Sequence, residues 1–266
     1  MEKVIDTAVK AAERASEILL DYFGRIKTFD VEEKARNDFV TEADKQSEMI
    51  IIKTIQEAFP QHTIVAEESG LHSGNDWKWY VDPLDGTKNF IHGLPMFCIS
   101  IGVEYKGDLV AAVIKAPVLE ETFIAEKGSG AYCNGERLKV SSRPFEMALI
   151  ATGFPFRGKE LLDSYLKCFK EVFLKVSGIR RCGSAALDLA YTAKGVFDGF
   201  WEMSLHPWDI AAGVLLIKEA GGKVSDFEGK DGYLKSGNIV GASPNTYKGL
   251  LEIVQRHLTQ EVENGL

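Results

Sequence analysis

The feature that most constrains the fold is the regular alternation of strand-like and helix-like segments beyond residue 144. Short runs rich in β-branched and aromatic residues alternate there with longer segments whose apolar residues recur at helical spacing. The predicted strands are 147–152, 176–181, 197–203, 223–226 and 238–242, and the predicted helices are 160–173, 184–194, 209–220 and 244–258. Such alternation is typical of an α/β half, in which helices pack in layers against a sheet.

The first half of the chain has a different pattern. Helices are predicted over Lys3–Phe23 and Thr41–Phe59, where Thr41 is the expected N-cap and Asp44 the third residue of a capping box. The predicted strands are 63–66, 77–82, 97–105, 109–115 and 121–126, with a last pair around Asn134-Gly135. This pattern predicts two helices on an antiparallel sheet. The polar segment Arg25–Val40 reads as a loop that contains a short hairpin, and its length suggests a functional lid.

We place the boundary between the halves at Ser141-Ser142-Arg143-Pro144, which gives an α+β half, residues 1–143, and an α/β half, residues 144–266. Together the two halves predict a layered sandwich with alternating αβαβα layers.

Composition excludes several classes of protein. The chain has 266 residues and a net charge of −8, which argues against nucleic-acid binding as its main role. An anionic substrate would therefore need another source of positive charge. The four cysteines form no C-x-x-C pair, which favours reduced thiols and a cytoplasmic setting. No apolar run approaches about 18 residues and the N-terminus is charged throughout, so neither a membrane span nor a signal peptide is expected.

The stretch Trp79–Asn89 places carboxylates close together on a bend. Asp82 and Asp85 flank the bend that Pro83 and Gly86 impose after a predicted strand, and a hydroxyl follows at Thr87. Crowded carboxylates repel each other unless a cation lies between them. The bend could instead be a solvated Pro-Asp-Gly surface turn, which needs no ligand.

Other segments offer partners for these aspartates. Glu67 follows a predicted strand, where it is either a ligand or a solvated turn charge. Asp209 opens a helix that is apolar nearly all round, where it is either a ligand or a helix cap. Ser184 opens another helix, whose amides suit an anion or a sugar hydroxyl unless Ser184 is a plain N-cap. No His or Cys stands at ligand spacing in these segments, so all-oxygen ligation points to Mg²⁺ or Mn²⁺.

These segments resemble the signatures of the inositol monophosphatase family. The matching segments are Ala66–Ser69, Trp79–Phe90, Gly183–Asp188, Trp208–Gly213 and Glu219–Gly222, in the family's order. The resemblance extends over essentially the whole chain, and Arg180–Tyr191 is most similar to bacterial members. It implies the sugar-phosphatase fold.

The resemblance also implies residue roles. The implied metal ligands are Glu67, Asp82, the Leu84 carbonyl, Asp85 and Asp209, for two or three Mg²⁺ ions that Mn²⁺ can replace. The implied catalytic residues are Glu67, Thr87 and Asp85, with Asp44 supporting Thr87. The implied substrate-binding residues are Gly86, Thr87, Gly183, Ser184, Ala185, Glu202 and Asp209. Lys34 lies in the loop that the family uses as a mobile, metal-sensitive element.

The implied function is Mg²⁺-dependent hydrolysis of a phosphate monoester of a small polyol or sugar, with myo-inositol monophosphate as first choice. Metal-activated water would attack without a covalent intermediate, unless Asp82 or Asp85 acts as the nucleophile. The resemblance is also compatible with fructose-1,6-bisphosphatase activity, with both activities in one site, or with a regulatory role that binds the transcription machinery. The family further implies a homodimer and inhibition by lithium. The Arg180-Arg181 pair would reach a second phosphate or form a salt bridge at a strand edge or dimer contact.

Overall fold

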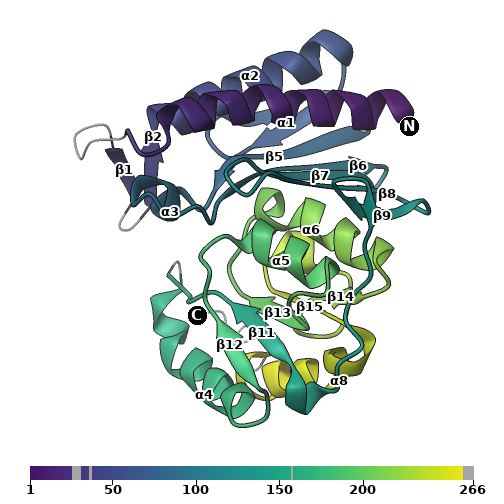
Figure 1. Ribbon diagram of the computed structural model, residues 1–266. Coiled ribbons are helices and arrows are strands. Elements are labelled where there is room, and N and C mark those ends of the chain that lie inside the picture. The colour runs from purple at the N-terminus through teal and green to yellow at the C-terminus, as the bar shows by residue number, and fades with distance from the viewer. Residues whose placement is uncertain (26–30, 36–37, 157, 260–266) are drawn as a thin grey trace.

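The computed structural model describes residues 1–25, 31–35, 38–156 and 158–259, and its description of side chains omits residues 31–39. The chain forms five layers in the order αβαβα, which confirms the predicted sandwich (Figure 1). Helices α1 (Glu2–Tyr22) and α2 (Glu42–Ala58) form the first layer, and α5 (Ala185–Ala193) and α6 (Pro207–Glu219) form the middle one.

An eight-stranded sheet separates these two helical layers. Its strands are β3 (Thr63–Ala66), β4 (Gly70–His72), β5 (Trp77–Asp85), β6 (Cys98–Tyr105), β7 (Asp108–Ala116), β8 (Glu121–Glu126), β9 (Gly130–Cys133) and β10 (Glu136–Arg137), in the order β10-β9-β8-β7-β6-β5-β3-β4. The prediction of an antiparallel sheet is wrong for one pair, because β3 and β5 run parallel. The short strand β4, which the sequence pattern did not indicate, pairs antiparallel with β3 and reverses the chain before β5 begins.

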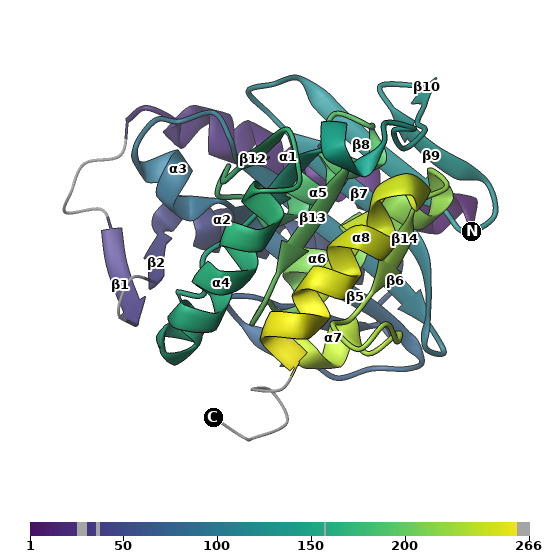
Figure 2. The same ribbon diagram turned by 90° about the horizontal axis from the view of Figure 1, so that it is seen from below.

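A five-stranded mixed sheet follows the middle helices. It contains β11 (Leu149–Thr152), β12 (Gly178–Arg180), β13 (Gly199–Glu202), β14 (Lys223–Ser225) and β15 (Ile239–Ala242), in the order β12-β11-β13-β15-β14. Helices α4 (Leu162–Phe173) and α8 (Pro244–Val254) lie beside each other on its outer face (Figure 2). All the strands and helices predicted for this half are present, within a few residues of their predicted ends.

Some short elements were not predicted. They are α3 (Thr87–Ile91), α7 (Tyr233–Ser236), the 3₁₀ turns Phe145–Met147 and Lys159–Leu161, and a π-helical turn, Gln255–Thr259. The hairpin expected between the first two helices is present, as β1 (Val31–Ala35) paired antiparallel with β2 (Asp38–Thr41). The lid function of this segment stays a prediction.

The middle helices pack unusually closely against their neighbours. A Cβ atom at Gly213 of α6 would lie 2.4 Å from the Leu189 Cβ of α5, and one at Gly102 of β6 would lie 2.7 Å from the Ala211 Cβ. Helix α6 is buried from Asp209 to Ile217, as its all-round apolar pattern predicted. One buried cluster contains residues of both sheets and of α5 and α6, so the two halves of the chain share a core. The division at residue 143 stays a prediction.

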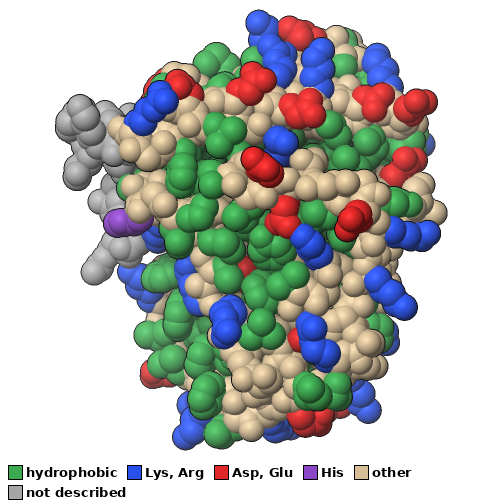
Figure 3. Space-filling view, in the orientation of Figure 1, with side chains coloured by type: hydrophobic (Ala, Val, Ile, Leu, Met, Phe, Trp, Pro, Cys, Tyr) green, Lys and Arg blue, Asp and Glu red, His purple; other side chains and the backbone are tan. Residues whose placement is uncertain are grey.

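Two further expectations were that the chain has no membrane span and that nucleic-acid binding is not its main role. None of the helices in the described ranges combines the length and the apolar character that a membrane crossing requires. On the face drawn in Figure 3, basic and acidic side chains are interspersed with hydrophobic ones, and they do not gather into a continuous basic stripe among the residues coloured there. That distribution agrees with the acidic net charge of −8.

Candidate active site

A cavity of about 190 Å³ lies where the two halves of the chain meet, between the ends of β5, β11 and β13 and the first turns of α3, α5 and α6. Every residue predicted to hold metal or substrate lines it: Glu67, Asp82, Leu84, Asp85, Gly86, Thr87, Gly183, Ser184, Ala185, Glu202 and Asp209. The fold therefore gathers into one pocket residues that are up to 142 positions apart (209 − 67) in the chain. Their individual roles stay predictions.

The bend after β5 is buried, so its interpretation as a solvated surface turn is wrong. Asp82 is only 2% exposed, and its Oδ1 accepts a hydrogen bond from the Leu84 amide at 2.9 Å. The register of β5 against β6 shifts between Asp82 and Asp85, which lets the chain turn. Gly86 then has φ +93°, and a Cβ there would lie 2.9 Å from the Met96 carbonyl oxygen. Glycine is required at this position to begin α3 and to place Thr87 in the pocket.

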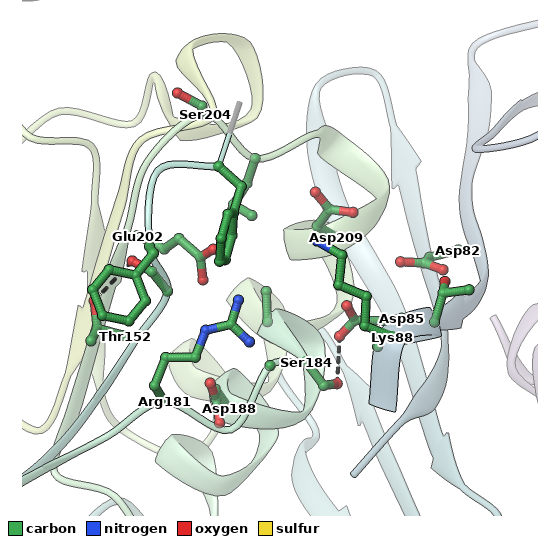
Figure 4. Close-up of a pocket in the computed structure, with 18 of the residues that line it drawn as sticks. Asp82, Asp85, Lys88, Thr152, Arg181, Ser184, Asp188, Glu202, Ser204 and Asp209 are labelled. Carbon is green, nitrogen blue, oxygen red and sulfur yellow. Dashed lines mark hydrogen bonds between the residues drawn. The ribbon is translucent and has the colours of Figure 1, made fainter. Parts of the chain in front are cut away.

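Asp85 joins the two halves of the protein. Its Oδ2 accepts hydrogen bonds from the Ser184 hydroxyl at 2.6 Å and from the Ala186 amide at 2.7 Å, at the N-terminus of α5 (Figure 4). The Ser184 side chain makes no cap hydrogen bond to its own helix. Its interpretation as a plain N-cap is therefore wrong, and the hydroxyl instead orients Asp85.

Asp209 is both a helix-capping residue and a pocket residue. It is the third residue of α6, and its Oδ2 accepts a hydrogen bond from the His206 amide at 2.7 Å. The two interpretations of Asp209 are thus compatible, because a carboxylate has about four acceptor positions and capping uses one. The His206 ring stacks on Trp208, with ring centroids 4.6 Å apart, and does not line the cavity.

Thr87 is held from behind by the first helical layer. Its hydroxyl is within hydrogen-bonding distance of the Leu84 carbonyl, at 3.1 Å, and of Asp44 Oδ1, at 3.3 Å. Asp44 is buried, and its Oδ2 accepts hydrogen bonds from the Thr41 amide and hydroxyl in the predicted capping box of α2. Asp44 does not line the cavity and reaches Thr87 from outside it, and its role in supporting Thr87 stays a prediction.

Burial raises the pKa of two aspartates in the pocket. Burial raises the pKa of Asp82 well above its usual value, and the charge of Glu67 is the next largest cause. The charges of Asp85 and Asp209 act in the same direction. Burial also raises the pKa of Asp85, although the hydrogen bonds from Ser184 and the α5 amides oppose that rise. Such a cluster favours either protons or a bound cation.

The donor set fits a hard divalent cation, since it consists of carboxylate oxygens and the Leu84 carbonyl. Among the described residues, no three His, Cys, Asp or Glu side chains are already arranged to hold a metal ion. Glu67, Asp82, Asp85 and Asp209 nevertheless line the same cavity.

The cavity also contains residues outside the predicted site. They are Lys88, Thr152, Gly153, Phe154, Phe156, Arg181, Asp188, Met203, Ser204 and Leu205. Lys88 and Asp188 lie within segments that match the family, so the sequence offered a reason to predict them as site residues. The loop after β11, which supplies Gly153 and Phe156, carries no motif. Gly153 is nevertheless required, because a Cβ there would lie 2.0 Å from Glu202 Oε1.

Lys34 is the remaining predicted site residue. Its backbone lies in β1, and its side chain is outside the described residues. Its role stays a prediction.

Comparison with known proteins agrees with the site. The model of the inositol monophosphatase family matches residues 1–259. The Nus factor SuhB of Pseudomonas aeruginosa is 46% identical over 265 residues, which cover 97% of this chain and 98% of that protein.

Solved structures agree as well. The extragenic suppressor protein suhB from Bartonella henselae is similar at a TM-score of 0.92 and 41% identity, over 96% of this chain and 99% of that chain. An inositol monophosphatase from Anabaena (Nostoc) is similar at a TM-score of 0.87 and 36% identity, over 98% of both chains. A family match over nearly the whole length, together with relatives at this identity, shows that the chain belongs to the inositol monophosphatase family.

Proposed function

We propose that this protein hydrolyses a phosphate monoester of a small polyol or sugar in a Mg²⁺-dependent reaction, with myo-inositol monophosphate as the first substrate. One observation carries the proposal. The pocket brings Glu67, Asp82 and Asp85 of the first half of the chain together with Asp209 and Glu202 of the second half in one cavity. Family membership supports phosphatase chemistry.

The residues proposed to hold two or three Mg²⁺ ions, or Mn²⁺ in their place, are Glu67, Asp82, Asp85, Asp209 and the Leu84 carbonyl. When bound, such ions supply an acidified water and neutralise charge on the phosphoryl oxygens and the leaving oxygen. They would also supply the positive charge that a protein of net charge −8 lacks.

The chain's own groups have positioning roles in this scheme. Thr87 would orient the attacking water, and the proton of that water would pass toward Glu67. The hydrogen bond to Asp44 holds the Thr87 hydroxyl in position. The amides of Gly86 and Thr87, at the start of α3, would bind phosphate oxygens. No covalent phosphoenzyme is needed, because the aspartates would be engaged as ligands.

The alcohol part of the substrate would lie against the second half of the chain. Glu202 would accept hydrogen bonds from its hydroxyls, and the backbone of Gly183, Ser184 and Ala185 would contact it at the start of α5. The Ser184 side chain is used differently, since its hydroxyl donates to Asp85.

The test is a phosphate-release assay with Mg²⁺ over a panel of inositol, sugar and aromatic phosphate esters. The proposal expects release that depends on Mg²⁺ or Mn²⁺ and is fastest with myo-inositol 1-phosphate. Absence of release from every ester would refute it. Equal or faster turnover of fructose 1,6-bisphosphate would instead favour the bisphosphatase or a dual activity.

A second candidate function is a regulatory, protein-binding role, and the observation that favours it is the name of the Pseudomonas relative, a Nus factor. In that case the protein would bind the transcription machinery and hydrolysis would be secondary. Asp85→Asn separates the two functions. A regulatory role predicts that this variant keeps the partner bound by the wild type while it loses phosphate release.

We also propose that the protein acts in the cytoplasm as a homodimer and is inhibited by lithium. Sedimentation at micromolar concentration tests the dimer, and titration of the phosphate-release assay with LiCl against a KCl control tests the inhibition. A monomer in the first experiment, or equal curves in the second, would contradict the respective proposal.

A further inference from the structure

Arg181 is an exposed cation at the mouth of the pocket, in the loop between β12 and α5. Its guanidinium carbon lies 5.2 Å from the centre of the Phe156 ring, at the distance of a cation–π contact. Gly183 leaves room for it, because a Cβ at Gly183 would lie 2.4 Å from Arg181 Nη1. Neither a strand-edge salt bridge nor any other ion pair within 4 Å engages Arg181 among the described residues.

Two carboxyl groups lie near this guanidinium on different elements. Glu202 ends β13 and Asp188 belongs to the first turn of α5, and in Figure 4 the guanidinium of Arg181 lies between them. The charge of Arg181 lowers the pKa of both groups, although burial raises both more strongly. All three side chains therefore act on one another across the same part of the cavity.

This part of the cavity contains unused hydrogen-bonding capacity. Asp188 is 1% exposed, and its Oδ1 has no hydrogen-bond partner among the described residues. No hydrogen bond from those residues engages the Glu202 carboxylate or the Arg181 guanidinium either. A buried acceptor such as Asp188 Oδ1 is costly to leave unpaired, and Arg181 offers donors on the same cavity, so together they indicate a ligand that both donates and accepts.

A hydroxyl group is the simplest ligand that does both. Its oxygen accepts from a guanidinium while its hydrogen is donated to a carboxylate, and the planar fork of arginine spans two neighbouring oxygens. Resting on the proposed phosphatase function, we propose that Arg181 is a substrate-binding residue that donates to two adjacent hydroxyls of the alcohol, which Glu202 contacts from the other side.

A second phosphate fits this place less well. Glu202 and Asp188 lie on both sides of the guanidinium in Figure 4, so a phosphate bound by Arg181 would compete with two carboxyl groups for the same donors. The geometry thus favours a neutral polyol with one phosphate over a bisphosphate.

The test compares two substrates with the full-length variant Arg181→Met. myo-Inositol 1-phosphate carries adjacent hydroxyls on its alcohol, whereas p-nitrophenyl phosphate carries none. We expect kcat/KM to fall about tenfold with the inositol ester, mainly through KM, and to change less than about twofold with the aromatic ester. Arg181→Lys, which keeps the charge without the fork, should recover only part of the loss.

Arg180→Met is the matched control. Arg180 is the neighbouring arginine at the end of β12, its Nη1 donates to the Ile179 carbonyl at 3.0 Å, and it does not line the cavity. Arg180→Met should leave kcat/KM unchanged with both the inositol ester and the aromatic ester.

Three outcomes would overturn the inference. Equal losses with both esters would make Arg181 a structural residue. A greater loss with fructose 1,6-bisphosphate than with inositol 1-phosphate would assign a second phosphate to Arg181.

If the wild type hydrolyses no ester, the proposed function fails by itself, and the role of Arg181 is then tested by calorimetric titration with myo-inositol. Weaker binding by Arg181→Met would support the inference, and equal or undetectable binding in both proteins would refute it.

Discussion

The two ends of the pocket are built differently. At the end formed by Asp82, Asp85 and Asp209, each carboxylate has an oxygen held by a backbone amide of the protein. At the end formed by Glu202 and Arg181, no hydrogen bond from the described residues holds either charged group. We call the first end pre-arranged only in the sense that the protein's own amides hold one oxygen of each aspartate. The second end would acquire its hydrogen bonds when an alcohol binds.

The largest expected effect comes from Asp85→Asn at the pre-arranged end. Removing this charge should lower the rate of phosphate release by at least about 100-fold and weaken Mg²⁺ binding, because even partners behind metal ligands contribute about 10- to 100-fold. The measurements are phosphate release and calorimetric Mg²⁺ titration. Asp108→Asn is the control, since Asp108 is an exposed residue paired with Lys127 at 3.1 Å. Unchanged metal affinity would contradict the assignment of this end.

Thr87→Val should have the next largest effect. The variant keeps the shape of the side chain and removes the hydroxyl that Asp44 and the Leu84 carbonyl hold. We expect kcat to fall about 100-fold with little change in KM, as for the loss of a proton-transfer group. Thr87→Ser should restore most of the activity. If the valine variant raised KM and left kcat intact, Thr87 would bind substrate without acting on the water.

Glu202→Gln tests the less constrained end. The amide keeps one acceptor oxygen but replaces the other with a donor, so KM for myo-inositol 1-phosphate should rise about tenfold. Turnover of p-nitrophenyl phosphate, whose leaving group has no hydroxyl, should change little. A similar loss with both esters would show that Glu202 serves the phosphate end, and the proposed difference between the two ends would not hold.

The smallest expected effect is on stability and concerns Asp188. Burial raises the pKa of this group to about 8, although Cys182 and Arg181 oppose the rise. As pH increases from the ordinary value of 3.8 toward about 8, the unfolded chain releases the proton that the folded protein keeps, so the free energy of unfolding falls. Asparagine cannot ionise and should therefore stabilise the metal-free protein by about 1–3 kcal/mol above that range.

Urea unfolding of wild type and Asp188→Asn at about pH 5 and about pH 9 measures this effect. The difference between the two proteins should be greater at the higher pH. An equal difference at both would mean that the Asp188 carboxyl ionises in the folded protein as it does in the unfolded chain.

Local sequence patterns were sufficient to predict most of the helices and strands. The apolar stripe of α1, the capping box at Thr41 and the alternation beyond residue 144 each depend on residues close together in the chain, and each is present in the structure. The parallel pairing of β3 with β5 was not predictable in this way. It depends on the short strand β4, whose three residues carry too little pattern to indicate a strand.

The candidate site divides in the same manner. Resemblance to a family identified the residues of the pre-arranged end, and the structure gathers them into one cavity. It did not include Arg181, Asp188 or Phe156 among the site residues. Phe156 stands in a loop without a motif, whereas Asp188 and Arg181 stand in or beside matching segments whose pattern alone does not tell which members face the cavity.

The sequence by itself determined the kinds of elements, their order and the family, because these follow from periodicity, caps and motifs carried by neighbouring residues. Only the tertiary structure decided which oxygen of Asp85 is held by Ser184, which face of α6 approaches β6 at Gly102, and that Arg181 lies between Glu202 and Asp188. Those relations join residues that are distant in the chain. They depend on how closely two sheets and a helical layer pack, and no local pattern encodes that distance.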